Sequence, residues 1–139
     1  MIRICPKCDV PLFVLHFKDI EVDFCQRCRG LWLDAGELEA MMGQIGAASD
    51  DPLLRFQQQT GVQPKDRPHL CPRCDDALHE IRVQRAGARA LMLDKCPRGH
   101  GLWFDADELQ QLLSMFPVES GASKTVDYLN ELFSAKSKL

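Results

Sequence analysis

The fold is decided by a stretch that reads Cys25-Gln26-Arg27-Cys28-Arg29-Gly30-Leu31-Trp32-Leu33-Asp34-Ala35-Gly36-Glu37-Leu38. It joins a Cys-x-x-Cys pair to a tryptophan and then to residues typical of a helix start. A second copy follows later in the chain, as Cys96-Pro97-Arg98-Gly99-His100-Gly101-Leu102-Trp103-Phe104-Asp105-Ala106-Asp107-Glu108-Leu109. Each copy is preceded by a Cys-Pro-x-Cys, at Cys5/Cys8 and at Cys71/Cys74. The chain therefore consists of two repeats of one pattern.

The size of the repeats indicates that each needs disulfide bonds or a bound metal ion for stability. A unit of roughly 45 to 50 residues is near the size at which a hydrophobic core alone becomes insufficient. Disulfides are the weaker interpretation, because the chain has seven cysteines and one thiol would be left over. The opening residues 1–5 contain no apolar run of signal-peptide length. We therefore expect a cytoplasmic protein, in a reducing compartment where Cys-x-x-Cys pairs bind metal or act as redox groups.

The first repeat contains a complete set of four thiol ligands. Two Cys-x-x-Cys turns present two sulfurs each, and together they complete the tetrahedron that structural zinc accepts. The predicted ligands of this first site are Cys5, Cys8, Cys25 and Cys28. Because iron also accepts four thiolates, the sequence leaves zinc and iron open here.

The second repeat has a histidine in place of its fourth cysteine. Gly99 stands at the aligned position, and His100 follows it. An imidazole reaches further than a thiol, so a shift of one residue is a reasonable replacement. The predicted ligands of this second site are Cys71, Cys74, Cys96 and His100. The other histidines of this repeat, His69 and His79, lie outside the repeated ligand register.

Apolar periodicity places a hairpin and then a helix in each repeat. The expected hairpin strands are 10–17 with 20–24, and 77–83 with 89–95. Asp34 and Asp105 are expected to cap the helices, with Glu37 and Glu108 at the third helical position. We expect the two tryptophans to cover the metal turns and pack on the helices. The glycines of the two Gly-Leu-Trp stretches, Gly30 and Gly101, are expected where the backbone is crowded or left-handed.

The predicted fold class is small, metal-stabilised α+β. It comprises two tandem zinc ribbons, each a β-hairpin with two cysteine turns followed by an α-helix, and an additional C-terminal helix. The expected segments are a first ribbon over 1–46, a linker with a short helix over 47–68, a second ribbon over 69–117 and a tail helix over 118–139. The expected cofactor is zinc, two ions per chain. No stretch approaches the ~20 apolar residues of a membrane span.

The repeated pattern resembles a known family. Cys-Pro-x-Cys, a hairpin and Cys-x-x-Cys-x-Gly-x-Trp-Leu-Asp-x-Gly-Glu-Leu are similar to the prokaryotic transcription factor zinc-finger (zf-TFIIB) zinc ribbons. The resemblance covers 3–42 nearly throughout and 69–113 with departures at Gly99/His100, Phe104 and Asp107. It implies zinc binding and a role in binding nucleic acid, by analogy of fold with a general transcription factor.

Function is less constrained than fold. Four protein ligands at each metal leave no open position for catalysis, so no enzyme and no small-molecule substrate are expected. The formal net charge of −3 gives nucleic-acid binding no support. A local basic cluster is the best such candidate: Arg82, Arg85, Arg89, Lys95 and Arg98. A protein partner, or self-association through the tail helix, therefore ranks slightly above nucleic acid. The alternative is a redox-responsive or rubredoxin-like protein that uses the four-cysteine site.

Overall fold

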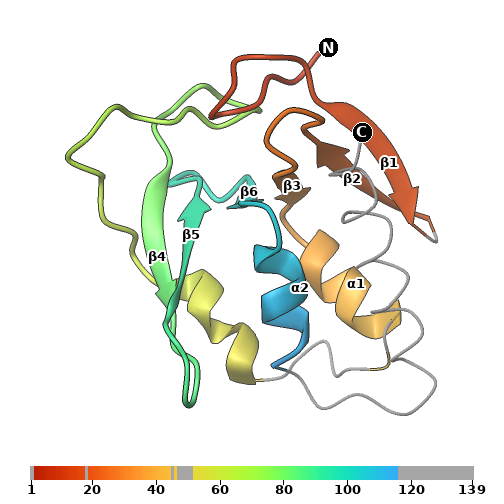
Figure 1. Cartoon of the computed structure of the whole chain (residues 1–139), viewed down its shortest axis with the longest axis vertical. Coiled ribbons are helices and arrows are strands. Elements are labelled where there is room, and N and C mark those ends of the chain that lie inside the picture. The colour runs from red at the N-terminus through yellow and green to blue at the C-terminus, as the bar shows by residue number, and fades with distance from the viewer. Residues whose placement is uncertain (1, 18, 45, 47–51, 116–139) are drawn as a thin grey trace.

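The two repeats form one continuous antiparallel sheet of six strands in the computed structural model. The structure describes residues 2–17, 19–44, 46 and 52–115. The strand order is β1-β2-β3-β6-β5-β4, so the edges of the sheet are β1 and β4 (Figure 1). The strands of the first repeat are β1 (Phe13–Phe17), β2 (Ile20–Phe24) and β3 (Leu31–Asp34). Those of the second are β4 (His79–Val83), β5 (Leu91–Lys95) and β6 (Gly101–Phe104).

The two halves of the sheet meet where β3 pairs with β6. Trp32 lies opposite Trp103, and Leu33 lies opposite Leu102. Because the paired residues come from equivalent positions of the two repeats, a pseudo-twofold axis passes between the tryptophans. The sequence predicted the hairpins β1–β2 and β4–β5, which the structure confirms. It did not predict the third strand of each repeat, and this third strand joins the two repeats.

Each face of the sheet carries its own apolar cluster. Leu31, Leu33, Leu102 and Phe104 belong to the cluster that also contains the buried residues of both helices. The two tryptophans alternate with these residues along β3 and β6, so they lie on the opposite face. There they pack with four buried cysteines and Leu78. The expectation that the tryptophans cover the metal turns is correct, and the expectation that they pack on the helices is wrong.

Both helices lie on the face opposite the cysteines. They are α1 (Glu37–Gln44) and α2 (Glu108–Leu113). The apolar periodicity that predicted the helices forms a buried stripe on each of them, at Leu38, Met41, Met42, Leu109, Leu112 and Leu113. Of the two hydrogen bonds expected in each cap, the one made by the glutamate is present. Glu37 accepts a hydrogen bond from the backbone N–H of Asp34, and Glu108 accepts one from the backbone N–H of Asp105. The aspartate carboxylates do not cap the helices, since they bind groups on the cysteine side of the sheet.

The linker packs against the second repeat. The 3₁₀-helix η1 (Pro52–Gln58) follows α1, where the sequence predicted a short helix. Its Leu54 and Phe56 are each only 7% exposed and belong to the cluster beneath the helices. The predicted tail helix lies outside the described residues. No helix among 2–17, 19–44, 46 and 52–115 is long and apolar enough to cross a membrane.

Candidate metal centres

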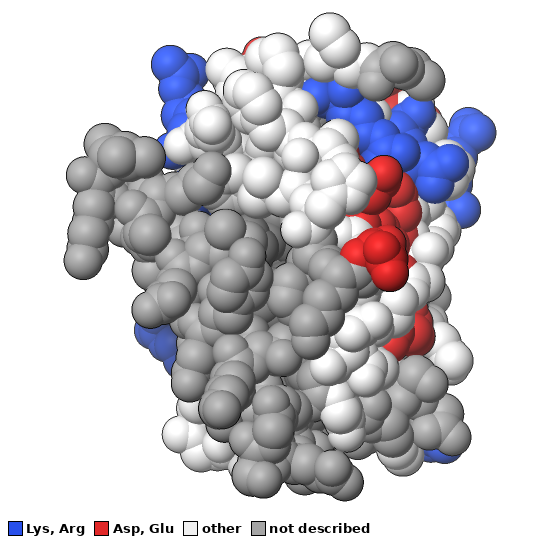
Figure 2. All heavy atoms as spheres, turned by 90° about the vertical axis from the view of Figure 1, so that its right-hand side faces the viewer, with Lys and Arg blue, Asp and Glu red and all other residues white. Residues whose placement is uncertain are grey.

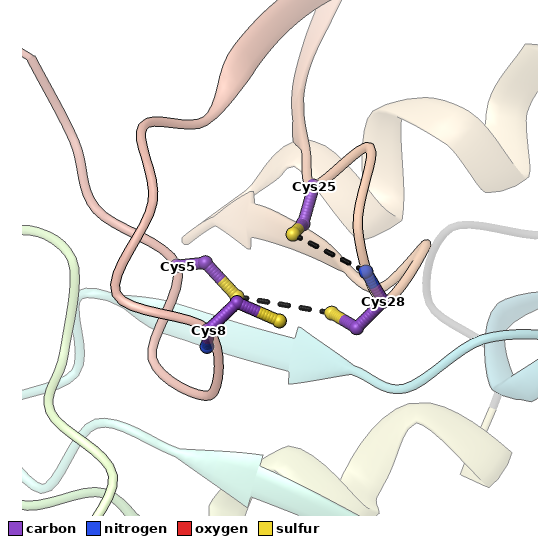
Figure 3. A group of neighbouring side chains, drawn as sticks. All are labelled: Cys5, Cys8, Cys25 and Cys28. Carbon is purple, nitrogen blue, oxygen red and sulfur yellow. Dashed lines mark hydrogen bonds between the residues drawn. The ribbon is translucent and has the colours of Figure 1, made fainter.

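The four cysteines of the first repeat converge on one point. Their sulfurs come from two turns, one before β1 and one between β2 and β3 (Figure 3). All four lie within 4.8 Å of one another, and the Cys5 and Cys28 sulfurs are 3.8 Å apart. Four thiolates at 2.3 Å around a tetrahedral zinc ion are about 3.8 Å apart, so this set fits zinc.

Backbone N–H groups stabilise negative charge on the sulfurs. The Cys5 sulfur accepts hydrogen bonds from the backbone of Lys7 at 3.4 Å and of Cys8 at 3.3 Å. The Cys25 sulfur accepts one from Cys28 at 3.5 Å. The neighbouring Cys5 thiol lowers the pKa of Cys28 to about 5, and the same contact raises the pKa of Cys5. Zinc would displace the remaining thiol protons, because it is bound by thiolates.

The second set combines three cysteines with one histidine. Cys71, Cys74, Cys96 and His100 have ligand atoms that all lie within 4.8 Å of one another. The Cys74 and Cys96 sulfurs are 3.6 Å apart, and Nδ1 of His100 lies 3.5 Å from the Cys96 sulfur. Tetrahedral zinc bonds of 2.3 Å to sulfur and 2.0–2.1 Å to nitrogen also give an N–S distance of about 3.5 Å. The donors fit zinc with Nδ1 as the nitrogen ligand.

The path of the backbone explains the histidine. In the first repeat the left-handed residue of the turn is Arg29, with φ 60°, and its N–H bonds to the carbonyl of Cys25. In the second repeat the left-handed residue is Gly99, with φ 80°, and its N–H bonds to the carbonyl of Cys96. The second turn therefore closes one residue earlier, and the next residue is the one presented to the metal. Glycine suits the earlier position because it adopts positive φ without strain.

Each set is bound to the other repeat by charged side chains that the sequence analysis did not single out. Trp103 donates its indole N–H to Asp105 at 3.1 Å, and Lys7 of the first repeat binds the same carboxylate at 2.8 Å. The equivalent pair on the other side is Arg73 with Asp34, at 3.6 Å. Both cations occupy the variable position of Cys-Pro-x-Cys, so a cation at that position in both repeats was the available signal.

A third cation binds Asp34 from its own repeat. One Nη of Arg3 lies 2.9 Å from Asp34 and 2.7 Å from Asp23. Asp34 also accepts the indole N–H of Trp32 at 2.9 Å. The aspartates after the tryptophans thus fix the indole rings and join the metal turns to the sheet.

The five basic residues of the predicted patch do not lie together in the structure. Arg82, Arg85 and Arg89 lie at or near the turn of the β4–β5 hairpin, whereas Lys95 pairs with His79 at its opposite end. Lys95 donates hydrogen bonds to the carbonyls of Gln57 and Gln59. Arg98 lies in the second metal turn, where it binds Asp76. Charge is also mixed on the face shown in Figure 2, where Lys and Arg atoms lie beside Asp and Glu atoms.

The other two histidines of the second repeat lie outside the metal set. His69 contacts the carbonyl of Pro6 through Nδ1 at 3.2 Å. His79 is in β4 and packs against the linker, where a Cβ added to Gly61 would lie 2.5 Å from its own Cβ. Neither ring contributes a ligand atom to the two sets of metal-binding groups in the described residues.

The family comparison agrees with these two sites. A family model described as "Transcription factor zinc-finger" matches residues 4–43 and 70–115, which together make up more than half of the chain. Each matched segment contains one complete ligand set. Neither a curated protein nor a solved structure matches the chain. With two ligand sets suited to two zinc ions, this chain belongs to the transcription factor zinc-finger family of zinc ribbons.

Proposed function

We propose that this chain is a non-enzymatic module in which two structural zinc ions hold a surface that binds another protein. Each metal set supplies four protein ligands, so no coordination position is left for a water or a substrate. The zinc ions would close the turns that cover the tryptophan face, which is a structural task.

The observation that carries the proposal is a pair of exposed apolar side chains at equivalent positions. Ile4 and Leu70 each precede the first cysteine of a repeat, and they are 41% and 45% exposed. Each is held by a β-bridge, Ile4 with Pro11 and Leu70 with Ala77. These residues are fixed next to the metal turns, where a partner protein could bury them. Single exposed apolar side chains are common on protein surfaces, so the support for a contact site is their fixed placement at the same position of both repeats.

Nucleic acid is the second candidate, and its support is weaker. Three arginines at the hairpin turn, Arg82, Arg85 and Arg89, favour it. Most of the aromatic side chains whose exposure the structure describes are too buried to stack on bases: Trp32, Trp103, Phe24, Phe56 and Phe104 are at most 7% exposed, whereas Phe13 is 50% exposed. A role in transcription is an expectation from the family's description.

The test compares matched surface variants of the zinc-loaded chain in affinity capture. Ile4→Asp/Leu70→Asp should lose a partner protein that the wild type retains. Val62→Asp is the control, because Val62 is 71% exposed but lies in the linker. Zinc content measured in parallel shows that each variant is folded. Equal capture by all three proteins would contradict the proposed surface.

Two further measurements separate the other candidates. Fluorescence anisotropy with DNA and RNA should show no tight binding at physiological salt. A salt-dependent complex that Arg82→Ala/Arg85→Ala/Arg89→Ala abolishes would favour nucleic acid instead. Metal analysis of protein purified without added zinc should give two zinc ions per chain. Iron in the four-cysteine site would favour the redox alternative.

A further inference from the structure

A cavity of about 460 Å³ lies between the first helix, the linker and the turn of the second metal set. The start of α1 lines it through Gly36 and Glu39, and η1 lines it through Leu54 and Arg55. Lys95, the last residue of β5, also contributes to the lining. This volume is within the range of cavities that hold small ligands, ~300–1,000 Å³.

Gln57 of η1 holds two opposite charges close together in this lining. Its side-chain nitrogen donates a hydrogen bond to Oε1 of Glu39 at 2.7 Å. Its backbone carbonyl accepts one from Nζ of Lys95 at 2.5 Å. Glu39 and Lys95 are therefore fixed on either side of one residue without touching each other. Among residues 2–17, 19–44, 46 and 52–115, neither of them nor Arg55 has an ion-pair partner.

The carboxylate of Glu39 is also incompletely hydrogen-bonded. Its Oε2 atom is buried and has no hydrogen-bond partner in the part of the chain that the structure describes. A buried carboxylate oxygen without a donor is costly, so native structures rarely keep one unless another group satisfies it. On the η1 side of the cavity, the exposed side chain of Arg55 adds a positive charge. The lining thus offers a carboxylate that lacks a donor and two cations that lack an anion.

These charges are not part of the repeated pattern. Under the pseudo-twofold axis, Glu39 corresponds to Gln110 of the second repeat, and Lys95 corresponds to Phe24 of the first. The equivalent positions on the other side of the molecule therefore carry no charge. Lys95 has a structural role as well, because it holds the end of η1, but the unpaired oxygen of Glu39 contributes nothing to that contact.

We propose that this cavity binds a small zwitterion of the free α-amino-acid class. The ammonium group of the ligand donates to Glu39. The carboxylate accepts from Arg55 and from the third N–H of Lys95, whose other two bind the linker carbonyls. An apolar side chain of the ligand packs on Leu54 and Leu102, which also line the cavity. The inference goes beyond the proposed function and does not depend on the partner surface.

An NMR titration of the full zinc-loaded chain with L-leucine tests the proposal. The backbone amide signals of Gly36, Gly99 and Gly101, which line the cavity, should shift and saturate. Isoamylamine lacks the carboxylate of L-leucine, and 4-methylpentanoate lacks its ammonium group. Each analogue should bind about tenfold more weakly, because each gives up a hydrogen bond between charged groups.

Two cavity variants test the same charges from the side of the protein. Glu39→Gln and Arg55→Gln should each weaken the binding of L-leucine about tenfold. The fold should accept Glu39→Gln, since the equivalent residue is Gln110. Arg89→Gln is the control, because it removes an exposed arginine outside the cavity, and it should bind as the wild type does.

Three outcomes would overturn the proposal. The first is the absence of a saturable shift at the three glycines. The second is an analogue that binds as tightly as L-leucine, because the cavity would then not recognise both charges. The third is equal binding of L-leucine by the wild type and both cavity variants, which would place the ligand elsewhere.

Discussion

Gly30 of the first repeat lies directly against the indole ring of Trp103 in the second. A Cβ added to Gly30 would be 2.3 Å from Cζ2 of Trp103 and 2.9 Å from the carbonyl of Phe104. The equivalent Gly101 would meet Cζ2 of Trp32 at 2.8 Å and the carbonyl of Leu33 at 2.2 Å. Each glycine therefore makes room for the tryptophan of the other repeat. This reciprocal contact is what lets β3 and β6 pair.

Replacing either glycine should destabilise the whole sheet. The added methyl group would meet backbone and a fully buried ring, and neither of these can move aside without disrupting the packing around it. We expect Gly30→Ala and Gly101→Ala each to lower the free energy of unfolding by about 2–3 kcal/mol. Urea denaturation of the zinc-loaded protein measures this change. Gly43→Ala is the control, since nothing lies within 4 Å of its added Cβ in α1; it should be neutral or slightly stabilising. Equal stability of Gly30→Ala and Gly43→Ala would contradict the contact.

Local patterns predicted the parts of the fold that local spacing determines. The ligand register, the hairpins and the apolar stripes all depend on residues close together in the chain. The strand Leu31–Asp34 was missed because its partner, Gly101–Phe104, belongs to the other repeat. The available signal was a short continuous apolar run, Leu31-Trp32-Leu33 in the first repeat and Leu102-Trp103-Phe104 in the second, which is typical of a strand buried on both faces.

The role of the aspartates could not be predicted for a similar reason. Asp34 and Asp105 are suited to a helix cap, and half of the cap geometry is present. Their carboxylates instead bind an indole N–H and a cation from the cysteine turn of the other repeat. Which of two satisfactory partners a carboxylate takes depends on tertiary contacts between distant segments, and the sequence pattern does not contain them.

Removing the Asp34 carboxylate should leave a buried donor without an acceptor. Trp32 is fully buried, and its indole N–H bonds to Asp34 at 2.9 Å. Asp34→Ala should cost about 2–4 kcal/mol, because the indole loses its acceptor and Arg3 loses one of its two carboxylates. Asp34→Asn keeps an acceptor and should cost about half as much. The measurement is again urea denaturation. Equal losses in the two variants would show that the charge, and not the indole bond, is what matters.

Removing His100 should affect only the second metal site. His100→Ala takes one of four ligands, so bound zinc should fall from two ions per chain toward one in buffer with a weak chelator. Atomic absorption on the dialysed protein measures this stoichiometry. His69→Ala and His79→Ala are the matched controls and should retain both ions, because neither ring belongs to the ligand set. Two tightly bound ions in His100→Ala would remove the histidine from the site.

The half-buried glutamates at the helix starts, Glu37 and Glu108, should make stability depend on pH. Burial, with the nearby charges of Asp34 and Asp23, raises the pKa of Glu37 to about 7. Burial, with Asp105 and Asp94, raises the pKa of Glu108 to about 7 as well. The folded state therefore binds these protons more tightly than the unfolded state, whose glutamate pKa is about 4.3. Their contribution is complete below that value and is lost as the pH rises through about 7.

Glu37→Gln and Glu108→Gln remove this titration and keep an acceptor for the backbone N–H of the aspartate. Each variant should gain stability relative to the wild type as the pH rises from 6 to 8. Zinc affinity also changes over this range, but it changes equally in variant and wild type, so the difference in melting temperature isolates the glutamate. Glu21→Gln, at an exposed carboxylate in β2, controls for the change in net charge. A difference between Glu37→Gln and the wild type that stays constant with pH would show that Glu37 does not titrate in this range. Because the two sites are equivalent under the pseudo-twofold axis, both variants should give the same sign.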